Sequence, residues 1–506
     1  MRRRTLRTLV AAAVLAVLLM SAAGGQAAPG SGAIALPSDA EIRKLLAERV
    51  DAQGGGFGIV VGVIGPQGRR VVSYGHPSQG DPRPLAGDTG FEIGSVGKVF
   101  TALLLADMVG RGEVALADPV AEHLPAGVKV PERNGRAITL ADLATHTSGL
   151  PFMPDDAFDD SPKATRYTSA RLYQFLARYQ LPRDVGAEWE YSNVGYWLLG
   201  EALASRGGKD YESLLRARIL APLHLQDTAI TLSPRQQAKL APGHDASLRV
   251  SPSMASIPAI AIMPAAGGLV STADDLLAFL AVTMGYERSP LAPAMANLLG
   301  TRRPMSRPDF RQALGWVLEG EGDAALIVHD GGTLGYASSV AWDPRQRVGV
   351  VVLANQVAGV GDLARHLLRP DVPLAKPAAK HTEITLDSAV LDAYAGRYEA
   401  PGEGLFVVAR EGDFLTLQLP GSWGLPKMRL HPESRRDFFA AELPLRVTFQ
   451  EDGQGGVSGM LVYPPRGQKP VAAKRTGIPP EPKGTSFRLS SRARARDLGE
   501  GRREGL

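Results

Sequence analysis

Apolar positions spaced three and four residues apart indicate several helices in the first three quarters of the chain. This spacing predicts helices over residues 38–49, 95–111, 139–145, 169–179, 193–205, 211–219 and 272–284. Short β-rich runs bounded by turn residues predict a hairpin at 57–64 and 70–74, and strands at 325–329, 336–342 and 348–354. The two strand groups enclose the helices along the chain. We therefore expect an α/β (α+β) domain over residues 30–370, with one antiparallel sheet flanked by helices and a helical subdomain beside it.

A different pattern follows residue 370. Residues 371–384 are rich in proline and alanine, which predicts a linker. Short apolar runs separated by glycine, proline or aspartate predict strands at 405–410, 414–419, 427–431, 438–442, 445–450 and 457–463. Their spacing favours a small all-β barrel or sandwich over residues 385–476. Residues 477–506 are polar and contain many arginines, which is typical of a disordered tail.

The N-terminal segment combines a basic start, an apolar run at residues 9–20 and the small-residue stretch SAAGGQA. This layout is typical of a secretory signal peptide, which we place at residues 1–27. An uncleaved membrane anchor is the alternative, although the apolar run is short for a helix that spans a bilayer. We therefore expect a periplasmic or secreted protein with no membrane segment after cleavage.

Composition narrows the possible chemistry. The chain of 506 residues has no cysteine, which excludes disulfides, thiolate metal sites and a cysteine nucleophile. Its nine histidines show no His-x-x-x-His or His-x-His spacing, so we expect no metal and no cofactor. The formal net charge is +4, and the four arginines among the first seven residues account for it, so nothing indicates a nucleic-acid partner. The absence of Gly-x-Ser-x-Gly argues against a nucleophile-elbow hydrolase.

The first candidate for chemistry is the chain's only Ser-x-x-Lys sequence, Ser95 to Lys98, at the start of a predicted helix. This spacing places both side chains on one helix face. A serine hydroxyl is a poor nucleophile until a neighbour takes its proton, which an amine in contact can do. Free backbone N–H groups at the helix start would stabilise negative charge on the attacked oxygen. Lys98 also lies among apolar residues, where an unpaired ammonium is costly and usually has a functional reason.

A second segment, EYSNVGYWLLG, offers Tyr191 and Asn193 before an apolar helix. The phenol could move a proton to a leaving group, and the amide could bind a substrate carbonyl. Each residue also has a structural explanation, since Tyr191 could be an amphipathic residue at a helix start and Asn193 a helix N-cap. His146 in THTSGLP is explained more readily by hydrogen bonds to neighbouring backbone groups than by catalysis.

Three ordered motifs resemble those of a known family. They are Ser95-x-x-Lys98, Tyr191-Ser192-Asn193 and His329-Asp330-Gly331. With the phrases LADLATHTSGLP and AAGGLVSTADDLLAF, they resemble the class C β-lactamases and the related penicillin-binding proteins, carboxypeptidases and esterases. The resemblance covers residues 40–360 and implies a β-lactamase/transpeptidase-like fold. The segment YAGRYEAPG is similar to an accessory domain attached to some of these hydrolases.

The resemblance implies a role for each catalytic residue. Ser95 would be the nucleophile that accepts the acyl group. Lys98 and Tyr191 would share the acid and base work as a coupled pair. Asn193 would orient the substrate amide or ester.

The third motif departs from the family pattern. The backbone N–H groups of Ser95 and Gly332 would form the oxyanion hole, and glycines at Gly331 and Gly332 would let the backbone approach the substrate. β-Lactam-hydrolysing members usually have Lys-Thr-Gly here, whose cation and hydroxyl hold a substrate carboxylate. His329 replaces that lysine and Asp330 the threonine. Strand alternation places His329 on the face of Gly331 and Asp330 on the other. A histidine is only partly charged near neutrality, so we expect ester or peptide hydrolysis more than β-lactam turnover.

The sequence therefore predicts an exported serine hydrolase that cleaves an ester or amide through a Ser95 acyl-enzyme. Its partner would be a small-molecule or peptide substrate, and the sequence leaves the oligomeric state open. The alternatives are a β-lactamase proper, and a penicillin-binding sensor that is acylated without turnover. A third alternative, an interaction module beside a decayed catalytic domain, is disfavoured by the intact set of Ser95, Lys98 and Tyr191.

Overall fold

The computed structural model describes residues 36–52, 55–156, 167–251, 253, 263–375, 381–420, 427–440, 445–453, 456–464 and 470–477. The predicted signal peptide, linker residues 376–380 and the predicted tail from residue 478 onward lie outside this part of the chain. Within it, no helix combines the length and apolar character that crossing a membrane requires.

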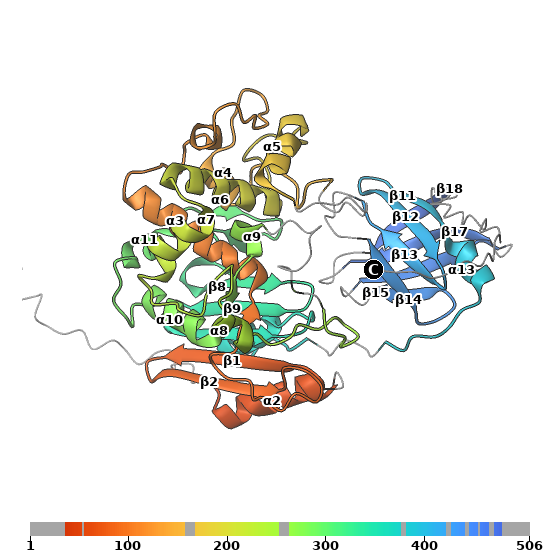
Figure 1. Ribbon diagram of the computed structural model, residues 1–506, viewed down its shortest axis with the longest axis horizontal. Coiled ribbons are helices and arrows are strands. Elements are labelled where there is room, and N and C mark those ends of the chain that lie inside the picture. Colours follow the sequence, from red (N-terminus) through yellow and green to blue (C-terminus); the bar gives the residue numbers. More distant parts are fainter. Residues whose placement is uncertain are drawn as a thin grey trace, which may run out of the picture.

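An eight-stranded antiparallel sheet lies at the centre of residues 36–375, in the order β2-β1-β10-β9-β8-β7-β6-β5 (Figure 1). Strands from both ends of this segment are neighbours, as the sequence predicts, because Ile59 of β1 pairs with Ala354 of β10. The three short strands β5, β6 and β7 extend the sheet beyond the prediction. The strands are β1 (Gly58–Gly65), β2 (Gly68–Gly75), β5 (Arg303–Pro304), β6 (Phe310–Gln312), β7 (Val317–Glu319), β8 (Leu326–Gly332), β9 (Ala337–Asp343) and β10 (Val348–Ala354).

Helices cover both faces of the sheet, with α2 and α10 on opposite sides of β1 in Figure 1. All eight residues of β1 are buried. Ile59 and Val61 lie in the core shared with α2 and α12, whereas Val60 and Ile64 lie in the core shared with α10. Because both faces are covered, this strand is a continuous apolar run rather than an alternating one. The three helices are α2 (Asp39–Ala52), α10 (Ala273–Thr283) and α12 (Gly361–Leu368).

The other helices lie between β2 and β5 along the chain. The predicted ones are present within a few residues of their expected bounds. The short helices α8, α9 and α11 were not predicted, because four to six residues that start with or next to a proline show no apolar period. These helices are α3 (Gly97–Gly110), α4 (Leu140–Ala144), α5 (Ser169–Arg178), α6 (Asn193–Gly207), α7 (Tyr211–Leu215), α8 (Pro234–Lys239), α9 (Pro264–Gly267) and α11 (Ala292–Asn297), with 3-10 turns at η1 (Gly94–Val96) and η2 (Val120–His123) and a π-helical turn at η3 (Arg216–Leu220). A further 3-10 turn, η5 (Gly322–Ala324), lies between β7 and β8.

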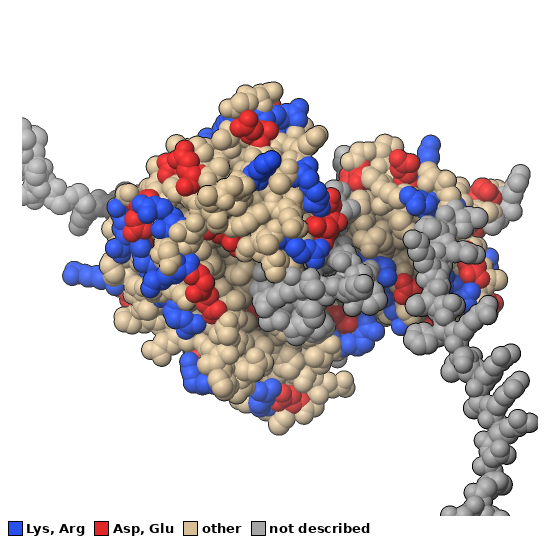
Figure 2. Space-filling view, turned by 45° about the horizontal axis from the view of Figure 1, so that its top comes forward, with Lys and Arg blue, Asp and Glu red and all other residues tan. Residues whose placement is uncertain are grey.

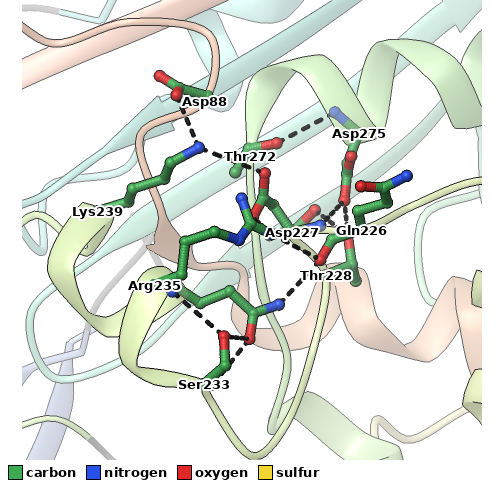
Figure 3. A network of polar contacts seen from close by, with 11 residues as sticks. Asp88, Gln226, Asp227, Thr228, Ser233, Arg235, Lys239, Thr272 and Asp275 are labelled. Carbon is green, nitrogen blue, oxygen red and sulfur yellow. Dashed lines mark hydrogen bonds and ion pairs between the residues drawn. The ribbon is translucent and has the colours of Figure 1, made fainter.

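A network of polar contacts connects three segments that are far apart in the sequence, namely the loop at residue 88, residues 226–239 and the start of α10 (Figure 3). Lys239 Nζ lies 2.8 Å from Asp88 Oδ2. Asp275 Oδ2 accepts hydrogen bonds from Thr228 Oγ1 at 2.8 Å and from the N–H of Asp227 at 2.9 Å. Asp88 precedes β3 (Phe91–Glu92) and Asp275 follows β4 (Val270–Ser271), two strands that pair with each other as a two-stranded antiparallel sheet.

The C-terminal region is a closed eight-stranded barrel, which decides between the predicted barrel and sandwich. Alternate residues of β16, Leu445, Val447 and Phe449, are buried inside it. The sequence missed β11 and β18, and β18 closes the barrel although only one of its residues is buried, so it has no apolar alternation to detect. The strands, preceded by α13 (Ser388–Tyr394), are β11 (Gly396–Ala400), β12 (Gly404–Glu411), β13 (Phe414–Gln418), β14 (Met428–Pro432), β15 (Asp437–Ala440), β16 (Leu445–Glu451), β17 (Val457–Tyr463) and β18 (Val471–Gly477). Gly477, which the sequence assigned to the tail, is the last residue of β18.

Charged side chains of both signs are interspersed on the face shown in Figure 2. Within the described part of the chain, charged side chains of opposite sign also form pairs, for example Lys239 with Asp88 and Arg410 with Asp392. Exposed pairs of this kind contribute little to stability individually.

Candidate active site

Ser95 lies in the 3-10 turn η1, directly before α3. The sequence predicted that Ser95 lies in the first turn of an α-helix, but the α-helix begins two residues later, at Gly97. Gly94, the first residue of this turn, has a φ of +48°, which glycine adopts readily. Ser95 is half-buried, and the helix α3 that follows is buried along almost its whole length.

The Lys98 ammonium is the centre of the site. Its side chain is completely buried, and Nζ lies 3.1 Å from Ser95 Oγ. The same nitrogen donates to Asn193 Oδ1 at 2.8 Å and to the carbonyl oxygen of Ala266 at 2.5 Å. An ammonium has three N–H donors, and here each has an acceptor. The Lys98 nitrogen thus connects its own helix, α3, to α6 and α9, and it does so next to the Ser95 hydroxyl.

Tyr191 and Asn193 both lie beside Lys98. The Lys98 nitrogen is 4.8 Å from the centre of the Tyr191 ring. Asn193 is the first residue of α6, and its N-cap is Ser192, whose Oγ accepts the N–H of Gly195 at 2.8 Å. The structural explanation of Asn193 as an N-cap is therefore wrong. Its side chain instead contacts Lys98 and, through Nδ2, Met153 Sδ at 3.9 Å.

The glycines of the third motif bring β8 against the Ser95 turn. A Cβ atom on Gly94 would lie 2.7 Å from the backbone nitrogen of Gly332, so the two backbones are in contact next to Ser95. A Cβ atom on Gly331 would lie 2.1 Å from the carbonyl oxygen of Ile93. Gly332, by contrast, is exposed and has no protein atom closer than 3.9 Å to such a Cβ. Packing within the protein therefore requires glycine at 94 and 331, whereas Gly332 has open space.

His329 and Asp330 face opposite sides of β8, as strand alternation predicts. The strand continues to Gly332, so His329 does not end it as the sequence indicated. The His329 ring is 4% exposed, and its Nδ1 lies 2.5 Å from the carbonyl oxygen of Gly315. On the other face, Asp330 Oδ2 lies 3.0 Å from Arg365 Nη2 of α12. Neither of the two positions carries a lysine.

Sequence reasoning missed several contributors to the site. The Ala266 carbonyl gave no signal, because any residue type can supply a backbone oxygen. Trp189 Nε1 donates to Gln312 Oε1 at 3.1 Å, which ties the segment before Tyr191 to β6. His146 does make the expected backbone contact, accepting the N–H of Ser192 at 3.1 Å. Its ring, however, also stacks on the Tyr191 ring with centroids 4.3 Å apart, which the sequence did not reveal.

The described residues hold no cluster of three or more His, Asp or Glu side chains that could bind a metal ion.

The comparisons with known proteins place this geometry in a family. The sequence profile described as Beta-lactamase matches residues 42–371, which is more than half of the chain. The chain belongs to the β-lactamase family. This family of serine hydrolases includes β-lactamases and D-alanyl-D-alanine carboxypeptidases.

Named members of the β-lactamase family are similar over most of their own length. The D-alanyl-D-alanine-carboxypeptidase/endopeptidase AmpH of Escherichia coli K12 is 30% identical over 347 residues, which cover 64% of this chain and 88% of AmpH. Penicillin-binding protein 4* of Bacillus subtilis is 25% identical over 424 residues, covering 77% of this chain and 89% of that protein. The crystal structure of a class C β-lactamase from Rhodobacter sphaeroides has a TM-score of 0.54 at 26% identity, covering 66% of this chain and 97% of that one.

Gly331→Ala is expected to lower the free energy of unfolding by about 2 to 3 kcal/mol, because a methyl group would overlap the Ile93 carbonyl. Urea unfolding measures this loss. The matched control is Gly110→Ala at the end of α3, where a Cβ atom has no neighbour within 4 Å and alanine favours the helix. Equal stabilities of the two variants would contradict the close approach of β8 to the Ser95 turn.

Asp330→Asn is expected to destabilise the protein by about 1 to 2 kcal/mol at pH 7, because it weakens the pair with Arg365. The side chain is 41% exposed, so solvent screening limits the effect. Thermal unfolding measures it, with the exposed Asp323→Asn as the control. A variant as stable as this control would contradict the pairing.

The same pair predicts a pH dependence. Burial works to raise the pKa of Asp330, but the Arg365 guanidinium and the Ser339 hydroxyl outweigh it, so the pKa lies below its ordinary value. The stabilisation is therefore complete above the ordinary aspartate pKa of about 3.9 and is lost as the pH falls through the lowered pKa of the folded state. The stability difference between wild type and Asp330→Asn should disappear in that acidic range.

Proposed function

We propose that this protein is an exported serine hydrolase that cleaves an ester or amide bond through an acyl-enzyme on Ser95. The observation that carries the proposal is the contact of Lys98 Nζ with Ser95 Oγ, Asn193 Oδ1 and the Ala266 carbonyl. Groups 95 and 168 residues away from Lys98 meet at its nitrogen, which also contacts the Ser95 hydroxyl. A buried lysine with such partners is a common feature of nucleophilic catalysis.

The chemistry would proceed in two steps. In acylation, Ser95 Oγ bonds to the substrate carbonyl carbon, and its proton passes to the pair of Lys98 and Tyr191. The pair returns a proton to the leaving oxygen or nitrogen as the bond to the carbonyl carbon breaks. Water then attacks the acyl ester by the same route, and the product acid leaves. The backbone N–H groups of Ser95 and Gly332 would stabilise the oxyanion in both steps, worth a few kcal/mol.

The substrate class follows from the third motif. His329 is buried against the Gly315 carbonyl, and Asp330 pairs with Arg365 on the far face, so this strand lacks the lysine that holds a substrate carboxylate in β-lactam-hydrolysing members. We therefore propose an ester or a D-amino acid peptide as substrate rather than a β-lactam. The similarity to AmpH, which is named a D-alanyl-D-alanine carboxypeptidase and endopeptidase, supports the peptide.

Export is part of the proposal. Its support is the basic start, apolar run and small-residue stretch of residues 1–27. The N-terminal sequence of the mature protein, recovered from the periplasm or the medium, would establish the cleavage site. Recovery of intact full-length protein in the membrane fraction would indicate an anchor instead.

The mature protein should be incubated with three probes: a chromogenic ester, a D-alanyl-D-alanine peptide and a chromogenic cephalosporin. Steady turnover of the ester or the peptide is expected. A single stoichiometric burst with the cephalosporin alone would indicate a sensor, and efficient cephalosporin turnover would indicate a β-lactamase proper. No reaction with any of the three would contradict the proposed activity.

A further inference from the structure

The ring of His146 contacts the same two tyrosines as the Lys98 ammonium. Its imidazole lies 4.3 Å from the Tyr191 ring, nearly parallel at 28°, and 5.0 Å from the Tyr196 ring. Lys98 Nζ lies 4.8 Å from the centre of the Tyr191 ring and 5.5 Å from that of Tyr196. The half-buried phenol of Tyr191 thus has a buried imidazole and a buried ammonium packed against it.

The backbone holds His146 in a conformation that histidine rarely adopts. Its φ is +57°, in the left-handed region that non-glycine residues enter at a cost. The surroundings fix it there. Its carbonyl accepts the N–H of Glu190 at 2.8 Å, and its Nδ1 accepts the N–H of Ser192 at 3.1 Å. Glu190 and Ser192 are the neighbours of Tyr191 in the chain, so His146 is hydrogen-bonded to the residue on each side of Tyr191.

We infer that His146 is a positioning residue that fixes the Tyr191 ring beside Lys98 for proton transfer during acylation. The inference rests on the proposed function, since it concerns the same Ser95 chemistry. The role differs from that of a catalytic base, because the ring acts through Tyr191 and not on the substrate.

The charge state of His146 suits this role. Burial lowers the pKa of His146 well below its ordinary value, and the nearby Lys98 and His329 lower it further. The imidazole is therefore neutral near pH 7 and places no second positive charge beside the Lys98 ammonium. Because Nδ1 accepts from Ser192, the hydrogen of the neutral ring is on Nε2.

Two substitutions of His146 distinguish the effect of its stacked ring from the effect of its hydrogen bond to Ser192. Asparagine tolerates a positive φ and can accept a hydrogen bond, but it has no ring to stack. Phenylalanine keeps the ring and loses the acceptor. We expect His146→Asn to lower kcat for p-nitrophenyl butyrate about 30-fold with KM changed less than twofold, and His146→Phe to lower kcat less, about fivefold. The control is His224→Asn, an exposed histidine with the same φ of +57°, which should match wild type.

A double-mutant cycle with Tyr191→Phe tests the coupling. If His146 acts through the Tyr191 phenol, His146→Asn should change kcat less than twofold once that phenol is absent. An equal loss in both backgrounds would overturn the inference and leave His146 a structural residue. A larger loss for His146→Phe than for His146→Asn would also overturn it, because the stacked ring would then not matter. Failure of the proposed function gives a different result, since wild type itself would then neither turn over the ester nor react with a fluorophosphonate.

A crystal structure of His146→Asn gives a readout that needs no activity. The Tyr191 ring should move by more than about 1 Å from its position 4.8 Å from Lys98 Nζ. If the variant does not fold, the structure of His146→Phe replaces it, and there the ring should stay in place. An unmoved Tyr191 ring in His146→Asn, or a displaced one in His146→Phe, would overturn the inference.

Discussion

Ser95→Ala is expected to reduce kcat for any substrate of this protein by at least about 10⁴-fold, because no acyl-enzyme can form without the Ser95 oxygen. The variant should still fold, since alanine fits the half-buried position and removes one hydrogen bond, from Lys98. Turnover of the chromogenic ester and labelling by a fluorophosphonate both measure the loss.

The control for this variant is Ser306→Ala, which removes an exposed hydroxyl before β6 and should leave kcat unchanged. Circular dichroism should show that both variants remain folded. Substantial turnover by Ser95→Ala would contradict the proposed nucleophile while leaving the family assignment intact, because that assignment rests on the sequence match and the fold.

Lys98→Met is expected to lower kcat about 10³- to 10⁴-fold, which is the range for losing a positioned acid or base. Methionine has a similar length and fits an apolar helix, so the buried volume is kept while the ammonium is removed. The Asn193 amide oxygen and the Ala266 carbonyl oxygen each lose a hydrogen-bond donor. Each buried acceptor left unpaired lowers the free energy of unfolding by about 1 to 3 kcal/mol. Removing a fully buried charge offsets part of that cost.

Rate constants for fluorophosphonate labelling as a function of pH would check this effect at the acylation step itself. The control is Lys209→Met, an exposed lysine after α6, which should label at the wild-type rate. Because Lys98 and Tyr191 are expected to titrate as a pair, the variant should also lose the pH dependence that the pair causes. A Lys98→Met protein that labels at the wild-type rate would contradict a role for the amine in proton transfer.

The contacts of Lys98 have a consequence for the first step. All three of its N–H groups are donated, one of them to Ser95 Oγ, so in this arrangement the ammonium orients the hydroxyl but cannot accept its proton. A proton must leave the pair of Lys98 and Tyr191 before Ser95 can be activated. After that loss, Lys98 and the Tyr191 phenol beside it share one proton fewer and can take the proton of Ser95, so the position of Tyr191 and the stacked His146 ring matter.

The periodicity of the sequence by itself determined most of the regular structure. The central helices and the strands β1, β2, β8, β9 and β10 were predicted within a few residues, because the helices have an apolar period and the strands are β-rich runs bounded by turn residues. The barrel was predicted for the same reason. The strands β5 to β7 and β18 were missed, because they are short or mostly exposed and have no buried face that alternation could reveal.

For the site, the sequence by itself predicted the pair Ser95 and Lys98 from their three-residue spacing, and proposed Tyr191 and Asn193 from a second motif without evidence that they lie near that pair. Only the tertiary structure brought Asn193 and the Ala266 carbonyl to the same ammonium and stacked His146 on Tyr191. It also determined that Gly94 and Gly331, rather than Gly332, are the glycines that the packing demands. The physical reason is that local patterns report which face of an element is buried, whereas contacts between distant segments depend on how whole elements pack together.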